Sequence, residues 1–234
     1  MAFDPSKYTV AKARPLPVVL LLDTSSSMNA GGEQTKITEL DSAVREMIKD
    51  FAHEEQLETE IQVSVITFGY DGVQLALPYT NASKIQMKKL EAQGNTPMGT
   101  ALRMAKDMIE DKETTPSRAY RPLVILCSDG APNDDWEVPM DNFIKEGRSA
   151  KCDRMAMAIG SDANEAVLKR FIEGTENPLF YAKDASTMHK FFKFVTMSVA
   201  TRSHSQNPNV IMKIEPPKEI IEPVTAIPDT GSYW

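Results

Sequence analysis

The chain has few cysteines, no long apolar run and no excess of positive charge, and each shortage excludes a class of protein. Only two of its 234 residues are cysteine, and neither has a second Cys or a His at zinc-finger spacing. No apolar run exceeds five residues, whereas a helix that spans a bilayer needs about 20. The net charge is −7, which leaves no overall basic footprint for nucleic acid. We therefore expect no structural zinc site, no membrane span and no nucleic-acid partner.

The composition predicts a folded protein of a reducing compartment. Apolar residues make up 41% of the chain and charged residues 25%, as is usual for soluble globular proteins. The first residues, Met1–Lys7, lack the apolar segment of a secretory signal. Cys127 and Cys152 are then best explained as reduced, buried thiols. Together these features predict a cytoplasmic location.

The pattern of apolar residues predicts alternating strands and helices. Two runs, Val18–Leu22 and Leu123–Cys127, are wholly apolar and each ends in a burst of polar residues, as expected for strands buried on both faces. A turn at Tyr70–Gly72 makes the next strand antiparallel, and Pro78 is expected to end it. The remaining spacings predict strands at 61–68, 73–77, 154–159 and 179–182, and helices at 36–55, 83–90, 101–109, 138–149, 164–173 and 186–201.

This order of elements predicts the fold class and the domain limits. The class is α/β: a doubly wound, Rossmann-like and mostly parallel sheet, with one antiparallel edge strand and helices on both faces. The domain is expected to cover residues 15–202, after an N-terminal extension at 1–14. Residues 203–234 hold five of the 15 prolines, which predicts an extended C-terminal tail, with a candidate strand at 210–214.

Three polar motifs follow the ends of predicted elements. Asp23, Ser25 and Ser27 come directly after the first apolar strand, Thr96 lies in a loop before a helix, and Asp129 follows the second apolar strand. Ligands of open α/β sheets bind at the carboxyl ends of the strands. Two carboxylates with several hydroxyls form a hard-oxygen ligand set. Such a set favours Mg²⁺, with Mn²⁺ as a substitute, whereas Ca²⁺, the remaining alternative, usually takes more carboxylates.

Each motif also has a simpler explanation. The Asp and Ser side chains of the first motif are favoured helix caps. Thr96 followed by Pro97 fits an N-cap with a first-turn proline. Asp129–Gly130 fits a plain turn. Asp134 and Asp135 fit solvated loop acids. These alternatives remain open at the level of single motifs.

Taken together, the motifs resemble the metal-ion-dependent adhesion site (MIDAS) of von Willebrand factor A domains, over about residues 15–202. The resemblance implies that Ser25 and Ser27 bind the metal directly, and that Thr96 does so directly or through water. It implies that Asp23 and Asp129 act largely through water and hydrogen bonds, and that a partner's acidic side chain fills the remaining position. Asn95 departs from the pattern, because many relatives have glycine there.

The resemblance implies a metal-dependent protein–protein interaction module that is not an enzyme. The residues of the motifs are similar to those of the bacterial stand-alone TerY-type proteins. This similarity implies an adaptor in a tellurium-resistance-like stress response or a defence system. A protein kinase and a metal-dependent protein phosphatase are the partners implied by that group. The alternatives are a Mg²⁺-dependent phosphatase-like hydrolase and a subunit of a chelatase-like, ATPase-driven assembly. Dehalogenase-type phosphatases carry a second carboxylate two residues after the nucleophile, where this chain has Ser25.

Overall fold

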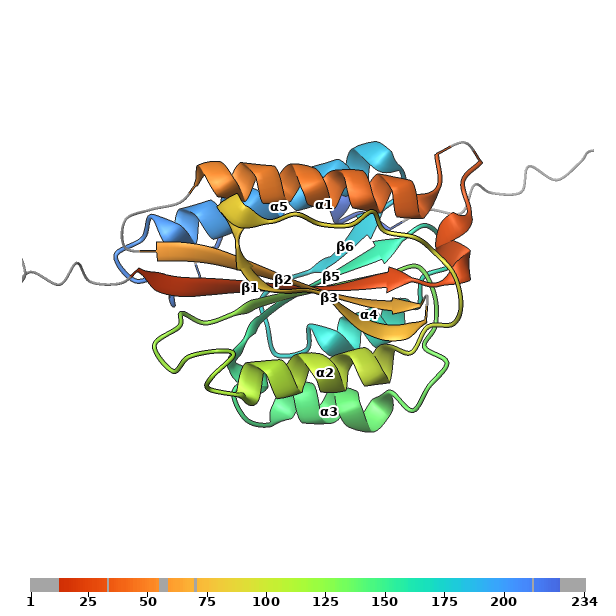
Figure 1. The fold of residues 1–234 in the computed structure, drawn as a ribbon. Coiled ribbons are helices and arrows are strands. Elements are labelled where there is room, and N and C mark those ends of the chain that lie inside the picture. Colours follow the sequence, from red (N-terminus) through yellow and green to blue (C-terminus); the bar gives the residue numbers. More distant parts are fainter. Residues whose placement is uncertain (1–12, 33, 55–58, 70, 212, 224–234) are drawn as a thin grey trace, which may run out of the picture.

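A computed structural model describes residues 13–32, 34–54, 59–69, 71–211 and 213–223, which form one sheet between two layers of helices (Figure 1). The strands are β1 (Arg14–Thr24), β2 (Thr59–Gly69), β3 (Gly72–Asn81), β4 (Leu123–Ser128), β5 (Asp153–Ile159) and β6 (Leu179–Ala182). The helices are α1 (Lys36–His53), α2 (Met98–Glu110), α3 (Glu137–Lys145), α4 (Glu165–Phe171) and α5 (Ala185–Ser203). Short 3₁₀ turns are η2 (Ser26–Asn29), η3 (Ala82–Lys84), η4 (Ser149–Lys151) and η5 (Lys218–Ile220).

The strand order is β3-β2-β1-β4-β5-β6, and every pairing is parallel except that of the edge strand β3 with β2. The predicted fold class is therefore confirmed. The chain leaves β1 for β2 on one side and later returns to β4 on the other, so the strand order reverses at β1. In open α/β sheets the ligand crevice lies outside the carboxyl ends of the strands at this point.

The middle of the strand β1, Val18–Leu22, is wholly apolar because helices cover both of its faces. Val18 and Leu20 pack in the core beneath α1 and α5, whereas Val19 and Leu21 pack in the core beneath α2, α3 and α4. All four side chains have no exposed surface. Each such burial stabilises the fold by about 1.5–3 kcal/mol. Figure 1 shows the two helical layers on opposite sides of the sheet.

Three local expectations are wrong. Pro78 does not end β3, which continues to Asn81; the proline lies on an edge strand, within a stretch where the register with β2 shifts, and an edge strand tolerates the missing N–H. The helix expected at 83–90 is only the single turn η3. In the described part of the tail, 210–214 forms no strand. Tyr70, in the predicted turn, lies outside the described residues.

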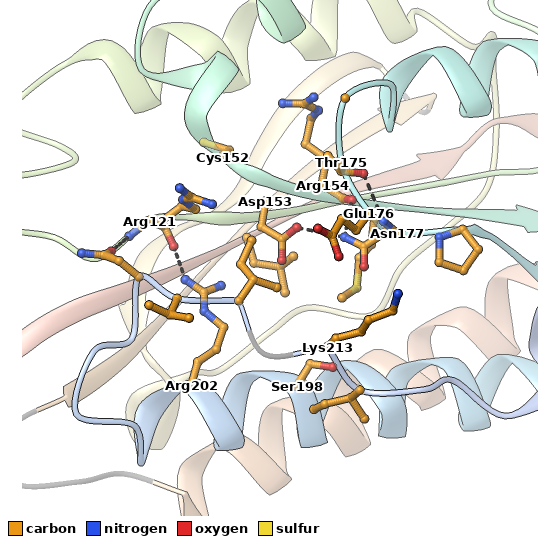
Figure 2. Close-up of a pocket in the computed structure, with 18 of the residues that line it drawn as sticks. Arg121, Cys152, Asp153, Arg154, Thr175, Glu176, Asn177, Ser198, Arg202 and Lys213 are labelled. Carbon is orange, nitrogen blue, oxygen red and sulfur yellow. Dashed lines mark hydrogen bonds between the residues drawn. The ribbon is translucent and has the colours of Figure 1, made fainter.

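The segment that follows α5 is anchored to the sheet rather than simply extended. Arg202 donates a hydrogen bond from Nη2 to the Arg121 carbonyl oxygen at 2.6 Å (Figure 2) and one from Nε to the Pro208 carbonyl oxygen at 3.0 Å. Ile220 is fully buried in the core beneath α5. The last residues of the predicted tail, 224–234, and most of the predicted N-terminal extension, 1–12, lie outside the described residues.

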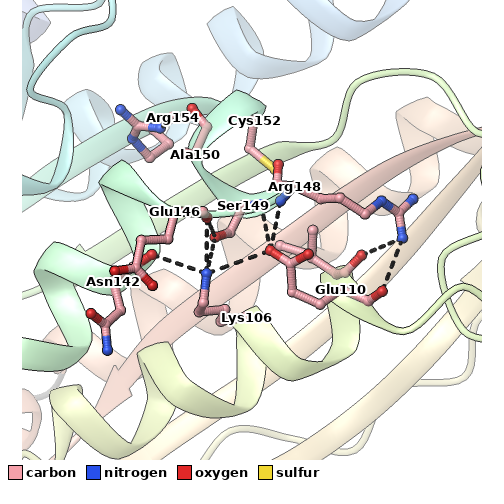
Figure 3. Close-up of polar contacts among 10 residues, drawn as sticks. Lys106, Glu110, Asn142, Glu146, Arg148, Ser149, Ala150, Cys152 and Arg154 are labelled. Carbon is pink, nitrogen blue, oxygen red and sulfur yellow. Dashed lines mark hydrogen bonds and ion pairs between the residues drawn. The ribbon is translucent and has the colours of Figure 1, made fainter.

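A lysine from α2 binds the carbonyl oxygens at the C-terminal end of α3. Lys106 Nζ donates hydrogen bonds to the Asn142 and Glu146 carbonyl oxygens at 3.0 and 2.9 Å and to Ser149 Oγ at 3.0 Å (Figure 3). Gly147 has φ +68°, the left-handed conformation that commonly follows a helix C-terminus. For these reasons α3 stops at Lys145 and not at residue 149 as predicted.

The two cysteines are free and buried, as expected from the sequence. Burial raises the pKa of the Cys152 thiol to about 12, and it raises the pKa of the Cys127 thiol as well. No helix of the described chain combines the length and the apolar character that a membrane crossing needs.

Candidate metal centre

Four of the five predicted site residues are linked by hydrogen bonds at the carboxyl ends of β1 and β4. The Oγ atoms of Ser25 and Ser27 lie 3.0 Å apart. Ser27 Oγ donates to Asp129 Oδ1 at 2.6 Å. The Ser25 backbone N–H donates to Asp23 Oδ1 at 2.8 Å. Residues from the two loops on either side of the strand-order reversal therefore form one cluster.

Asp23 organises the loop that follows β1. Its carboxylate is fully buried, and its second oxygen accepts a hydrogen bond of 2.6 Å from Ser128 Oγ at the end of β4. Burial raises the pKa of Asp23, and the nearby charge of Asp129 raises it further, while the hydrogen bonds from Ser128 and Ser25 oppose the shift. With both oxygens occupied by hydrogen bonds, Asp23 holds the two strand ends together.

The two serines of the first motif do not act as helix caps. Ser25 precedes η2, but its side chain makes no capping hydrogen bond there. The next helix, α1, is capped by Thr35 instead. The hydroxyls of Ser25 and Ser27 face each other and the Asp129 carboxylate. The capping explanation of this motif therefore does not describe the structure.

A close approach of β2 fixes the start of the same loop. Gly69 pairs with Thr24 at the end of the sheet and has φ +151°. A Cβ atom at Gly69 would lie 2.2 Å from the Thr24 carbonyl carbon and 2.5 Å from the Ser25 nitrogen. Only glycine fits there without displacing the backbone that carries Ser25.

The loop that carries Thr96 is held at the same edge of the sheet. The loop before α2 is tied to the end of β1 by hydrogen bonds from Gln93 N–H to the Thr24 oxygen and from Ser26 N–H to the Gly94 oxygen. Thr96 itself is buried. Within the described chain, no hydrogen bond links its hydroxyl to the other four predicted ligands. The structure thus brings Thr96 to the edge of the cluster, and its role as a ligand stays a prediction.

Two residues of the loop after β4, which the sequence did not single out as functional, hold this arrangement. Asn133 Oδ1 accepts the Thr96 N–H at 3.1 Å, and the Asn133 N–H donates to the Thr96 oxygen at 3.2 Å. Asp134 accepts the N–H groups of Gly99 and Thr100 at 2.9 and 2.8 Å. The first turn of α2 is therefore capped by Asp134 and not by Thr96. Asp134 is consequently more than the solvated loop acid that the sequence suggested.

A basic residue also enters the centre. Lys36 Nζ lies 2.7 Å from Asp129 Oδ2, and the Asp129 side chain has no exposed surface. Lys36 is the first residue of α1, 93 positions before Asp129. Sequence spacing contains no indication of such a contact, because it joins segments that only the folded chain brings together.

The chemistry of the donor set fits a hard divalent cation. Ser25, Ser27 and Asp129 present only oxygen atoms, the donors that Mg²⁺ and Mn²⁺ prefer. Throughout the described chain, no three His, Cys, Asp or Glu residues gather into a group that could hold a metal. The cluster differs from such a group because it combines one carboxylate with two hydroxyls.

A separate cavity of about 730 Å³ lies at the amino-terminal ends of β4 and β5 (Figure 2). Buried Asp153 and Arg202 line it, with Glu176 and Asn177 on the loop before β6. Asn177 Nδ2 donates to Asp153 Oδ1 at 2.9 Å, whereas Arg202 Nη1 is buried with no hydrogen-bond partner among the described residues. No sequence pattern indicates this cavity, which shares no residue with the metal centre.

The fold is similar to several solved structures. A von Willebrand factor type A protein from Catenulispora acidiphila aligns with a TM-score of 0.58 and 20% identity over 80% of this chain and 42% of that one. The PilB minor pilin from Streptococcus sanguinis aligns with a TM-score of 0.56 and 15% identity over 82% of this chain and 63% of that one. Proximal thread matrix protein 1 from the mussel byssus, with a zinc-occupied MIDAS motif, aligns with a TM-score of 0.60 and 17% identity over 79% and 48%. The chain spans less than two thirds of each of these proteins.

The sequence comparison gives the family. No curated protein sequence matches the chain. A model of the von Willebrand factor type A domain matches residues 18–194, which contain all six strands except the first four residues of β1. The chain therefore belongs to the von Willebrand factor type A domain family.

Proposed function

We propose that this protein is a metal-ion-dependent protein–protein interaction module that binds Mg²⁺, with Mn²⁺ as a substitute. The observation that carries the proposal is the contact of Ser25, Ser27 and Asp129 through their side-chain oxygens at the point where the strand order reverses. These three residues would hold the cation, and Asp23 would keep their loops in place. The mussel protein with a zinc-occupied MIDAS motif supports a divalent cation at a site of this kind.

The proposed partner supplies an acidic side chain. When bound, the cation supplies two positive charges, and two neutral hydroxyls and one carboxylate neutralise them only in part. The remaining positive charge attracts an external carboxylate. Ser26 and Ser27 are exposed whereas Ser25 is buried, so a partner can approach the turn after β1 from the side of Ser27. The chain's own part is to fix these oxygens in place before the partner arrives.

We infer a binding role rather than catalysis from the same residues. Ser25 stands where a dehalogenase-type phosphatase needs its general acid, so the Asp23 carboxylate has no acid partner at that position. The free, buried cysteines agree with a cytoplasmic location. The residues of the motifs at Asp23–Met28 and Ser128–Asp134 resemble those of the TerY-type group. This resemblance supports a role in a stress response, beside a protein kinase and a phosphatase.

Titration calorimetry with MgCl₂ and MnCl₂ tests the metal. The unmodified protein should bind one divalent cation, and the double variant Ser25→Ala/Ser27→Ala should bind none. Ser26→Ala is the matched control, because Ser26 belongs to the same turn but its Oγ donates to the Gly94 oxygen. Absence of binding by the unmodified protein to either cation contradicts the proposal.

An affinity capture experiment tests the partner. The protein is immobilised and exposed to extract with Mg²⁺ or with chelator, and the proteins that only the Mg²⁺ sample retains are identified. Ser26→Ala should retain the same proteins, and Ser25→Ala/Ser27→Ala should lose them. Equal retention by the double variant would show that any partner binds elsewhere.

A further inference from the structure

Lys36 already places one positive charge in the metal centre. Its ammonium group contacts Asp129 Oδ2 at 2.7 Å, while Ser27 Oγ donates to the other oxygen of the same carboxylate. The Asp129 side chain has no exposed surface, and the Lys36 side chain is 20% exposed. Among the ion pairs of the described chain, this pair is the one that reaches the cluster.

The path of the lysine side chain is closely defined. Lys36 begins α1, and its backbone N–H is held by the Ala30 oxygen at 3.0 Å. Its stem passes over Gly160, directly after β5, where an added Cβ would lie 3.1 Å from Lys36 Cε and 3.2 Å from Nζ. Gly160 has φ +74°, a conformation that favours glycine. The end of β5 thus leaves room for the ammonium group to reach Asp129.

The two buried carboxylates of the centre are stabilised in different ways. Taking a carboxylate out of water is unfavourable unless it is paired and hydrogen-bonded. Asp129 meets both conditions without any metal, through Lys36 and Ser27. Asp23 is stabilised differently, by hydrogen bonds from Ser25 and Ser128. Within the chain, the charge of Asp129 is therefore balanced by Lys36.

We propose that Lys36 is the resident counter-ion of the metal centre and competes with the divalent cation for Asp129. The inference deepens the proposed function and rests on it for the position of the metal. Lys36 neutralises Asp129 when the metal is absent, so the centre stays folded without metal. A cation that binds Asp129 must displace the ammonium group or share the carboxylate with it, and either event weakens metal binding. Lys36 thereby sets the metal concentration at which the module becomes competent to bind its partner.

The test measures metal affinity after removal of the lysine charge. Lys36→Met keeps the length of the stem without the charge, and Lys36→Gln keeps a hydrogen-bond donor in case the methionine variant does not fold. Lys49→Met is the matched control, because Lys49 is an exposed residue of the same helix and the substitution removes the same charge. Calorimetry with MgCl₂ should give a dissociation constant at least tenfold lower for both Lys36 variants than for the unmodified protein and the control.

Thermal unfolding gives a second measurement that does not depend on a partner. Without metal, the Lys36 variants should unfold at a lower temperature than the unmodified protein, because Asp129 is left buried and unpaired. The same excess of Mg²⁺ should raise their unfolding temperature by more than it raises that of the unmodified protein, since a ligand that binds the native state stabilises it by an amount that grows with the logarithm of its concentration divided by the dissociation constant.

The outcomes separate this inference from the proposed function. If the unmodified protein binds Mg²⁺ and the Lys36 variants bind it no more tightly, the inference is overturned and the metal centre stands. Equal tightening by Lys49→Met also overturns the inference, because the effect is then one of overall charge. If only the Lys36 variants bind, the counter-ion role is supported and the proposed function fails. If no form binds Mg²⁺, both are overturned.

Discussion

Asp134 accepts two hydrogen bonds from Thr100, from the backbone N–H at 2.8 Å and from the hydroxyl at 3.0 Å, across 34 positions of sequence. The same carboxylate accepts the Gly99 N–H. The loop after β4 therefore supplies the cap of α2, the helix that follows the Thr96 loop. This relationship couples the stability of α2 to the geometry of the candidate metal centre.

Replacing this cap should destabilise the protein. Asp134→Ala leaves the first N–H groups of α2 without their acceptor and removes a negative charge from the positive end of the helix dipole. We expect a loss of about 1–2 kcal/mol in the free energy of unfolding, measured by urea denaturation. Asp135→Ala is the control, because the neighbouring acid is exposed, and it should change stability by less than about 0.5 kcal/mol. Equal effects of the two substitutions would contradict the capping role.

The Thr96 loop offers a second prediction, on metal affinity. Asn133→Ala removes the side-chain acceptor of the Thr96 N–H but leaves the Asn133 N–H bonded to the Thr96 oxygen. With one of two ties lost, Thr96 should be less well positioned, and Mg²⁺ affinity should fall several-fold while the fold persists. Calorimetry of the variant beside the unmodified protein measures this. An unchanged dissociation constant would contradict the positioning role of the Asn133 side chain.

A third prediction concerns the link between α2 and α3. Lys106 Nζ satisfies two carbonyl oxygens at the end of α3 and the Ser149 hydroxyl (Figure 3). Lys106→Met should lower the free energy of unfolding by about 2–4 kcal/mol, since hydrogen bonds to a charged group contribute about 1.5–3 kcal/mol each and do not add fully. Lys145→Met is the control. Its ion pair with Asp141 is exposed, so its loss should cost less than about 1 kcal/mol. A similar loss for both variants would refute the special role of Lys106.

The sequence predicts those parts of the fold that local patterning determines. The strand at 179–182 and the start of a helix at Lys36 are found at the predicted residues, because apolar periodicity specifies each one locally. The antiparallel strand β3 was also expected from its turn. Its continuation past Pro78 was not, because that depends on the strand lying at the edge of the sheet.

The residues of the site likewise fall into those that local sequence patterns predict and those that depend on packing. The residues of the first motif and Asp129 could be found from their position after apolar strands, since the topology of a parallel sheet brings such ends together. The contacts of Lys36 and Asp134 could not, because each joins segments that are more than 30 positions apart through side chains without a sequence pattern. Long-range polar contacts of this kind are set by packing, which a single sequence does not display.

The last prediction concerns pH and the buried acid of the second cavity. Burial raises the pKa of Asp153, although the charge of Arg202, the hydrogen bond from Asn177 and the charge of Arg121 oppose the shift. The folded protein therefore holds this proton more tightly than the unfolded chain, whose ordinary value is 3.8. The resulting penalty is absent well below that value, grows as the pH rises, and is complete above the raised pKa of the folded state.

Asp153→Asn removes this titration while keeping a side chain of the same shape beside Asn177. The free energy of unfolding of the variant, minus that of the unmodified protein, should therefore increase as the pH rises from below 3.8 through the raised pKa of Asp153. Urea denaturation of both proteins across this range measures the difference, and the subtraction cancels the titration of Asp23 and other groups common to both. A difference that falls with rising pH would mean that the ionised Asp153, paired electrostatically with Arg202, stabilises the fold.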